Sequence, residues 1–242
     1  MDFFYQATRR LILRFLGRLR NLAISSESVV EAQARLAWAD AQSFIYANAV
    51  TGTRLFEDIG EMRDWVLAEA PTEGLLLEFG VYKGRSISRF AMRLRELGDH
   101  RPIIGFDSFR GLGEEWIGPL GDYSERFDLE GSLPAVPPGV ELVPGWIEET
   151  LPVFWRENSG PVAFVHIDTD TYGPAKVVLE TLREHCSSGT VVLFDELLGY
   201  PSWRSNEFRA LNEVFRAEEY DFIAFGSGGA GHAFVKAAIR IR

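Results

Sequence analysis

Acidic side chains end four short apolar runs of this chain: Glu78, Asp107, Asp168 and the adjacent pair Asp195-Glu196. Ligands of open α/β sheets bind outside the carboxyl ends of the strands, so acids at these positions would meet at one edge. For any single acid, a turn or a helix cap is a sufficient explanation. Like charges on one edge repel, however, unless a cation or a donor-rich ligand meets them. The row of acids therefore indicates a binding site.

Three of these carboxylates suit a metal ion. Asp168, Asp195 and Glu196 follow two apolar runs that we expect to be neighbouring strands, and no cysteine lies near them in the sequence. Oxygen-only donor sets favour hard divalent cations. The sequence therefore predicts that Asp168, Asp195 and Glu196 bind Mg2+ or a similar divalent cation.

His166 lies two residues before Asp168, so on a strand the two side chains would share a face. It is either a hydrogen-bonded core histidine or a general base beside the metal. Asp170 would hold the following loop or a substrate hydroxyl.

A glycine-rich turn follows the apolar run Leu75–Phe79 and precedes an apolar-periodic segment. Gly80 and Gly84 would let the backbone approach a ligand, and the free N–H groups of the next helix would face it. The Gly-x-x-x-Gly spacing differs from the dinucleotide fingerprint, and Glu78 sits inside the strand end. Both features favour a small nucleoside ligand, with Asp107 accepting hydrogen bonds from ribose hydroxyls.

The elements that must position these residues alternate between strands and helices from residue 75 onward. This alternation predicts an α/β fold with a Rossmann-like, mostly parallel sheet of seven strands. A glycine-rich separator at 226–231 predicts that the last two strands form an antiparallel hairpin. The expected strands are 75–79, 102–106, 140–143, 162–167, 190–194, 221–225 and 232–241.

Helices account for the rest of the expected structure. Two helices over 26–47 and 52–69 form an N-terminal extension or lid (1–70), followed by the main domain (71–242). Further helices are expected over 175–186 and 204–217. The long segment 108–138 is rich in glycine and proline and reads as a functional cover.

The first 24 residues combine apolar side chains with arginines, as in a basic amphipathic helix. We favour packing on the domain or on a second subunit, giving a homodimer, over contact with a membrane.

Composition narrows the function classes. A net charge of −10 and a pI near 5.0 argue against a nucleic-acid partner. Cys186 is the only cysteine, so an intrachain disulfide and a thiolate zinc cluster are excluded, and a cytoplasmic location is expected. Its apolar surroundings in the sequence favour a packed small side chain over a nucleophile.

The motifs also carry a family resemblance. The segment Leu77–Ser86 resembles the first motif of class I S-adenosylmethionine-dependent methyltransferases, close to the cation-dependent catechol and caffeoyl-CoA type. Segments 105–112 and 166–172 are similar to those of the macrocin O-methyltransferase (TylF/MycF-like) family, which methylates sugar hydroxyls of natural products. The resemblance covers about residues 72–242.

This resemblance implies an O-methyltransferase that uses S-adenosylmethionine and acts on a hydroxyl of a small molecule. It implies that Asp168 is metal ligand and candidate base, that Asp195 and Glu196 complete the metal set, and that Trp146 flanks the adenine. The family usually has Asp-Asp or Asp-Asn where this chain has Asp195-Glu196. The residues that would hold the cofactor are Glu78, Gly80, Tyr82, Gly84, Ser86, Asp107 and Ser108.

Three alternatives remain open at the level of sequence. One is a metal-independent methyltransferase with His166 as its base. Another is an NAD(P)-dependent oxidoreductase of similar architecture, and the third is a non-catalytic binding protein. The acceptor could be a sugar, polyketide or phenolic hydroxyl, enclosed by 108–138, the N-terminal helices and the segment 200–204.

Overall fold

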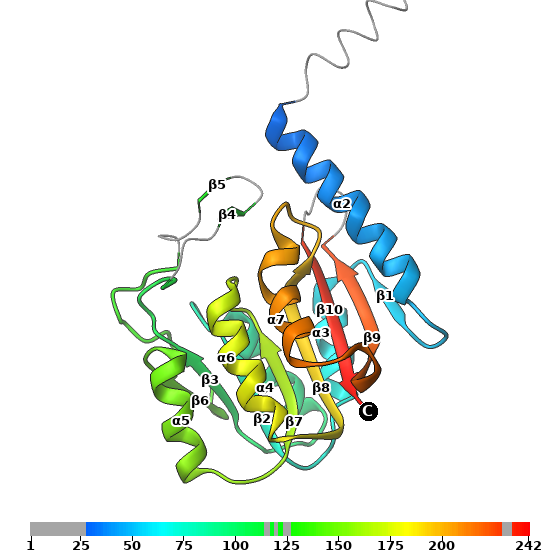
Figure 1. Ribbon diagram of the computed structural model, residues 1–242. Coiled ribbons are helices and arrows are strands. Elements are labelled where there is room, and N and C mark those ends of the chain that lie inside the picture. Colours follow the sequence, from blue (N-terminus) through cyan, green and yellow to red (C-terminus); the bar gives the residue numbers. More distant parts are fainter. Residues whose placement is uncertain (1–27, 114–116, 119–120, 123–126, 229–233) are drawn as a thin grey trace, which may run out of the picture.

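The structure, a computed structural model, describes residues 28–113, 117–118, 121–122, 127–228 and 234–242. An eight-stranded sheet crosses it in the order β1-β9-β10-β8-β7-β2-β3-β6 (Figure 1). Only β10 is antiparallel to its neighbours, β8 and β9, and the other pairs are parallel. The strands are β1 (Arg54–Phe56), β2 (Leu75–Phe79), β3 (Ile103–Asp107), β6 (Val140–Pro144), β7 (Val162–Ile167), β8 (Cys186–Leu198), β9 (Tyr220–Ser227) and β10 (Val235–Ile241).

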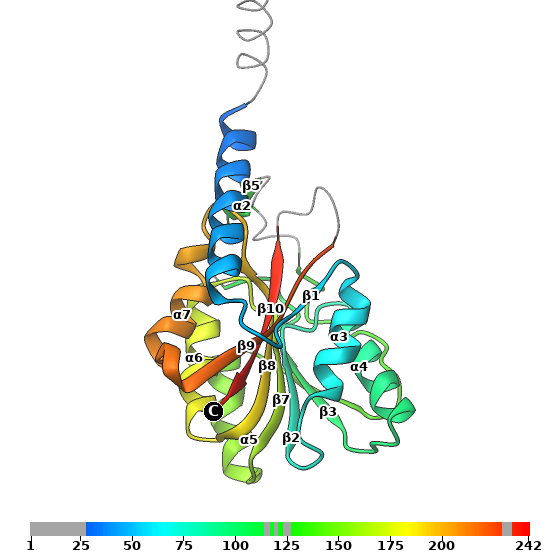
Figure 2. The ribbon, with the colours of Figure 1, turned by 90° about the vertical axis from the view of Figure 1, so that its right-hand side faces the viewer.

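Helices cover both faces of this sheet (Figure 2). One face carries α3 (Ile59–Ala68) and α4 (Arg85–Glu96), and the other carries α5 (Ile147–Glu157), α6 (Tyr172–Arg183) and α7 (Glu207–Val214). The long helix α2 (Val29–Asn48) lies at one end, on the α7 side. Short elements complete the chain: the β4 (Ile117–Gly118) and β5 (Gly121–Asp122) pair, and the 3-10 turns η1 (Trp203–Ser205) and η2 (Ala217–Glu219). The predicted Rossmann-like α/β architecture is confirmed.

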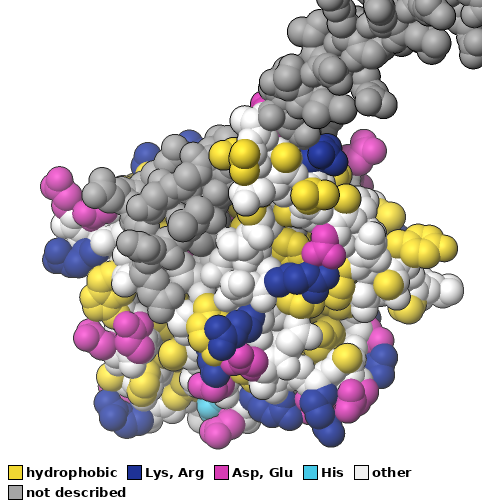
Figure 3. All heavy atoms as spheres, turned by 45° about the horizontal axis from the view of Figure 1, so that its top comes forward, with side chains coloured by type: hydrophobic (Ala, Val, Ile, Leu, Met, Phe, Trp, Pro, Cys, Tyr) yellow, Lys and Arg dark blue, Asp and Glu magenta, His cyan; other side chains and the backbone are white. Residues whose placement is uncertain are grey.

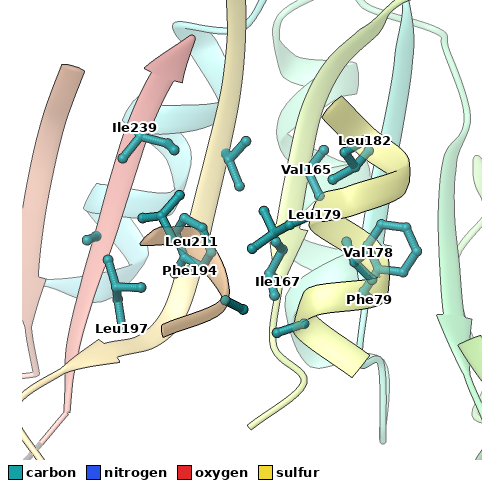
Figure 4. Close-up of a cluster of buried hydrophobic side chains, with 14 of the residues drawn as sticks. Phe79, Val165, Ile167, Val178, Leu179, Leu182, Phe194, Leu197, Leu211 and Ile239 are labelled. Atoms are coloured by element: carbon teal, nitrogen blue, oxygen red, sulfur yellow. The ribbon is translucent and has the colours of Figure 1, made fainter. Parts of the chain in front are cut away.

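The sheet alternates its side chains between two apolar cores. On the α5–α7 face, Phe79, Ile167 and Phe194 pack against Leu179 and Leu211, all with at most 2% exposure (Figure 4). The α3 and α4 face has its own cluster. Because the central strands are covered on both sides, they are nearly continuous apolar runs, and each fully buried side chain of this size contributes about 1.5–3 kcal/mol. Polar side chains concentrate at the strand ends.

Helix α2 docks through an aromatic cluster. Its N-cap Ser28 accepts a hydrogen bond from the Glu31 amide. The Phe44 ring lies 5.9 Å from Trp203 and 5.1 Å from Phe208. Trp203 is therefore a core residue with 1% exposure. This position differs from a wall of the acceptor site, the role considered for the segment 200–204.

The predicted helix over 52–69 is wrong in its first part. Residues Arg54–Phe56 form β1, which pairs in parallel with β9 and adds an eighth strand to the predicted seven. The outer edge of β9 offers backbone partners that local periodicity does not reveal. Asp58 then caps α3 by accepting from the Glu61 amide at 2.8 Å.

Two other predicted helices extend past their observed C-terminal ends. α6 ends at Arg183, and Cys186 begins strand β8, so β8 starts before the predicted residue 190. The helix predicted over 204–217 is reduced to α7, with 3-10 turns on both sides.

The surface seen in Figure 3 intersperses Lys and Arg side chains with Asp and Glu side chains. One of the exposed pairs joins Arg204 to Asp40 of α2 at 2.8 Å. Among the helices that the structure describes, none is long and apolar enough to cross a membrane. The basic amphipathic segment, residues 1–24, lies outside the described residues, as does Trp116 of the predicted cover.

Candidate active site

A cavity of about 360 Å3 opens at the carboxyl ends of the central parallel strands. Its volume suits a small molecule. The predicted residues Gly80, Tyr82, Ser86, Asp107, Ser108, Trp146 and Asp168 all line it. Other lining residues are Arg63, Val81, Lys83, Arg85, Gly111, Leu112, Gly113, Phe127, Ile147, Glu148, Thr169, Asp170, Thr171 and Pro174.

The glycine turn brings two loops into contact. Gly80 has a φ of 87°, and a Cβ at this position would lie 1.8 Å from the carbonyl oxygen of Asp168. The Asp168 amide also donates to the carbonyl of Phe79 at 2.8 Å. Gly84, with a φ of 74°, begins α4 as its N-cap, although it does not line the cavity itself. The glycines therefore set the position of Asp168 as well as the shape of the turn.

Asp107 braces the same turn. One of its carboxylate oxygens accepts the Val81 and Tyr82 amides at 2.8 and 2.7 Å, and the other accepts the Phe109 amide at 2.6 Å. Each carboxylate oxygen has two acceptor sites, so capacity for a ribose hydroxyl remains on the second oxygen. The bracing role was not predicted from the sequence.

Aromatic residues line the wall of the cavity. Trp146 is the N-cap of α5, and its ring would lie 3.3 Å from a Cβ placed on Gly113. Tyr82 meets Phe127 edge to face at 5.3 Å. Ser108 stabilises the adjoining turn by donating to the Gly111 carbonyl at 3.1 Å. A flat ring such as adenine would find apolar partners here.

Glu78 and His166 lie beneath the cavity and do not line it. Both are fully buried. Glu78 accepts the Ser86 hydroxyl at 2.8 Å and lies 3.2 Å from His166 Nδ1. Burial lowers the pKa of His166, but Asp195 and Glu78 outweigh burial and raise this pKa to about 9. Full burial between two carboxylates favours a core role for His166, and its role as a base stays a prediction.

Asp195 is paired with two cations. Arg63 of α3 lies 2.6 Å from its Oδ1, and Lys236 of β10 lies 2.6 Å from its Oδ2. His166 Nε2 is 3.4 Å from Oδ1. Burial raises the pKa of Asp195, but Lys236, His166 and Arg63 hold it well below its usual value. Both oxygens of this carboxylate therefore have a cationic partner, and the ionised form of Asp195 is favoured.

The acids form two groups that share Asp168. Oxygens and nitrogens of His166, Asp168 and Asp195 lie within 4.8 Å of one another, and so do the oxygens of Asp168, Asp170 and Glu196. Asp195 and Glu196 fall in different groups because successive side chains of a strand point to opposite faces of the sheet. The predicted set Asp168, Asp195 and Glu196 is thus not brought together as one group, and Asp170 takes the place of Asp195.

The second group would carry surplus negative charge if all three of its carboxylates were ionised, and the pKa values of these groups are raised accordingly. Burial and repulsion from Asp195 raise the pKa of Asp168 to about 7. Burial and neighbouring acids raise the pKa values of Asp170 and Glu196 well above their usual range. Glu196 Oε2 is buried without a hydrogen-bond partner among the described residues. An oxygen-only set with an orphaned acceptor and surplus charge fits a hard divalent cation.

Sequence reasoning missed Arg63, Lys236 and Glu207. Glu207 begins α7, is fully buried, and accepts from Thr169; burial and Asp168 raise its pKa to about 8. All three lie on elements remote in sequence from the strand-end motifs. Lys236 has one signal in the sequence, since it is one of only two charged residues, with Arg240, in the apolar final strand.

Comparison with known proteins agrees with this fold. The profile of a family described as "Methyltransferase domain" matches residues 77–197, half of the chain. A relative from Streptomyces olivaceus, 8-demethyl-8-(2,3-dimethoxy-alpha-L-rhamnosyl)-tetracenomycin-C 4'-O-methyltransferase, is 28% identical over 170 residues. That alignment spans 62% of each protein, so it covers less than two thirds of the relative.

Solved structures share the fold. CalS11, a calicheamicin methyltransferase, is 26% identical with a TM-score of 0.58 over 75% of this chain and 77% of CalS11. The O-methyltransferase NovP has a TM-score of 0.53 at 19% identity over 75% of this chain and 78% of NovP, which supports the fold alone.

The glycine turn, the strand-end acids and the sheet order define a class I methyltransferase. The chain belongs to the methyltransferase domain family, which is the family predicted from its motifs and not the NAD(P)-dependent oxidoreductase alternative.

Proposed function

We propose that this protein transfers the methyl group of S-adenosylmethionine to a hydroxyl of a small molecule of the sugar or natural-product type. The observation that carries the proposal is the position of Asp168. It lines the cavity, touches the glycine turn through its backbone and belongs to both acid groups. Cofactor cradle and acid cluster therefore meet at one residue.

The cofactor half is the wall formed by the glycine turn, Asp107 and Trp146. Backbone amides at the start of α4 suit the methionine carboxylate, Asp107 suits the ribose, and Trp146 suits the adenine. Glu78 acts indirectly, by orienting Ser86 through their 2.8 Å hydrogen bond. S-adenosylmethionine supplies an electrophilic methyl group.

The acceptor half is the acid cluster. Asp168, Asp170 and Glu196 would hold a divalent cation, and Asp195 supports them from the adjacent group as an ionised carboxylate fixed by Arg63 and Lys236. A divalent cation held there would supply Lewis acidity, which lowers the pKa of a bound hydroxyl. Asp168 then is the candidate base, since it reaches the cavity and His166 does not. The remaining residues position the reactants, in keeping with the absence of a nucleophile motif from the sequence.

The acceptor class follows from the relatives. The Streptomyces olivaceus relative is named as a rhamnosyl 4'-O-methyltransferase, and CalS11 is also described as a TDP-rhamnose 3'-O-methyltransferase. We infer a deoxysugar hydroxyl, free, nucleotide-linked or already attached to an aglycone.

Calorimetry with S-adenosylmethionine and with NAD, followed by transfer of a labelled methyl group, tests the proposal. The acceptor panel is TDP-L-rhamnose, methyl α-L-rhamnoside and catechol, each with EDTA and with Mg2+ restored. We expect S-adenosylmethionine alone to bind, with Mg2+-dependent labelling of a rhamnose. Binding of NAD alone would refute the methyltransferase, and full activity in EDTA would remove the metal while leaving methyl transfer in place.

We also propose a cytoplasmic homodimer assembled through the N-terminal helices. Support comes from exposed apolar side chains on α2, with Leu36 at 60% and Tyr46 at 90% exposure. Light scattering of the whole chain and of a variant without residues 1–24, together with liposome sedimentation, separates a dimer from membrane contact.

A further inference from the structure

The loop that carries the proposed base is held from a helix outside the matched family segment. Glu207, the first residue of α7, is completely buried. Its Oε1 accepts the backbone amide of Thr169 at 3.1 Å and the Thr169 hydroxyl at 3.3 Å. Thr169 directly follows Asp168 and lines the cavity. The carboxylate thus fixes the backbone beside the reacting group.

The loop needs such a support because its backbone is strained. Asp170 has a φ of 63°, in the left-handed region that non-glycine residues seldom adopt. The next amide, of Thr171, donates to the Thr169 carbonyl at 2.6 Å and closes a tight turn around Asp170. This conformation places Asp170 within 4.8 Å of the oxygens of Asp168 and Glu196. Strain of this kind persists only where the surroundings determine it.

The loop has two supports, one from each side. β2 holds Asp168 through the Phe79 carbonyl and the close approach at Gly80, and α7 holds Thr169 through Glu207. The first support keeps the base beside the cofactor turn. The support from Glu207 fixes the direction in which the backbone of residues 169–171 leaves the cofactor turn. Without Glu207, the buried Thr169 amide would lose its acceptor, and the turn around Asp170 would be free to relax.

We propose that Glu207 is a positioning residue, which holds Thr169 so that Asp168 and Asp170 face the cavity together. It acts through the loop and does not line the cavity itself. The role requires an acceptor oxygen at this position and does not require a charge. Its effect on turnover rests on the proposed function, whereas its effect on the loop does not.

The test compares Glu207→Ala and Glu207→Gln with a control on the same helix. Glu213→Gln is the control, since Glu213 also joins α7 to α6, but accepts only from the side chains of Tyr172 and Lys176, whereas Glu207 accepts the backbone amide of Thr169. Hydrogen exchange of the 168–172 peptide in the whole protein is the first measurement. Calorimetry with S-adenosylmethionine and kcat with the acceptor found in the panel are the others.

We expect Glu207→Ala to speed exchange in the 168–172 peptide at least tenfold and to lower kcat about 10- to 100-fold, as for residues that orient metal ligands. Glu207→Gln should restore both within about threefold, because an amide oxygen can accept both bonds. Cofactor affinity should stay within threefold. If Glu207→Ala fails to fold, Glu207→Asp takes its place, since the shorter side chain withdraws the acceptor.

Unchanged exchange in Glu207→Ala, or in Glu207→Asp where it takes the place of Glu207→Ala, would overturn the proposal, and so would equal effects in Glu213→Gln. If the wild-type protein binds no S-adenosylmethionine, the proposed function is refuted. The hydrogen-exchange measurement would still test whether Glu207 positions the loop.

Discussion

Lys236 Nζ and Asp195 Oδ2 lie 2.6 Å apart, and they join the last strand of the sheet to the candidate active site. Lys236 also donates to the Asp195 carbonyl at 3.0 Å. Their side chains are only 12% and 10% exposed. A pair this deeply buried is costly to break, because removal of Lys236 leaves Oδ2 of the buried Asp195 without its cation, and Arg63 and His166 contact only Oδ1.

Lys236→Met should therefore destabilise the protein by about 3–5 kcal/mol at pH 7, measured as the free energy of unfolding in urea. Arg63→Met should destabilise the protein less, since Arg63 is more exposed than Lys236 (19% against 12%) and does not bind the Asp195 carbonyl as Lys236 does. Lys176→Met is the control: Lys176 pairs with Glu213 at the surface, where ion pairs contribute little. A loss for Lys236→Met no larger than for this control would show that Asp195 does not depend on its cation.

Gly80→Ala tests the close approach between the cofactor turn and Asp168. The added methyl would lie 1.8 Å from the Asp168 carbonyl oxygen, so one of the two loops must move. Gly98→Ala is matched in backbone conformation, with a φ of 74° and no atom within 4 Å of the new Cβ. The control should lose only the left-handed penalty of about 1–2 kcal/mol. We expect Gly80→Ala to lower the free energy of unfolding by more than Gly98→Ala does. We also expect it to weaken S-adenosylmethionine binding at least tenfold. Equal effects in both variants would contradict the contact.

The sequence predicted the acids at the strand ends better than it predicted their grouping. Strands buried on both faces leave polar residues only at their ends, so Asp107 and Asp168 could be placed at the cavity from the apolar runs alone. The division of Asp195 from Glu196 depends on side-chain direction, which the alternation rule contains but which a prediction of convergence overlooks. Arg63 and Glu207 could not be found, because their roles depend on how α3 and α7 pack on the sheet.

The same limit explains the errors in the fold. β1 exists because the edge of β9 offers it partners, a tertiary effect absent from local periodicity. The second part of the predicted helix over 52–69 is confirmed as α3, and its apolar residues Met62 and Val66 are fully buried.

The single cysteine gives a prediction with a pH dependence. Burial raises the pKa of the Cys186 thiol to about 11. The reactive thiolate is therefore scarce in the folded protein at pH 8, whereas an unfolded cysteine has a pKa of about 8.5. We expect Ellman's reagent to react with the native protein at least about 100-fold more slowly than with the protein in guanidinium, with the native rate rising up to pH 10 and beyond. A native rate that levels off near pH 8.5 would indicate an exposed, ordinary thiol.

Asp168→Asn separates function from stability at the proposed base. The carboxylate lies among Asp170, Asp195 and Glu196, and burial with repulsion raises its pKa to about 7. Its folded pKa exceeds its unfolded value of 3.8, so the ionised group destabilises the fold increasingly as the pH rises from about 4 to about 7. The neutral amide should therefore raise the free energy of unfolding at pH 8 in EDTA, while turnover falls at least about 1000-fold because base and cation ligand are both lost. S-adenosylmethionine should still bind, since Asp107 and the Gly80 turn are untouched.

Asp128→Asn is the control for Asp168→Asn. Asp128 lies in an exposed turn, where it accepts the Glu130 amide, so its substitution should change neither the free energy of unfolding nor turnover appreciably. Near-normal turnover in Asp168→Asn would remove Asp168 as the base, and a loss of stability would show that its charge is compensated by groups other than those named here.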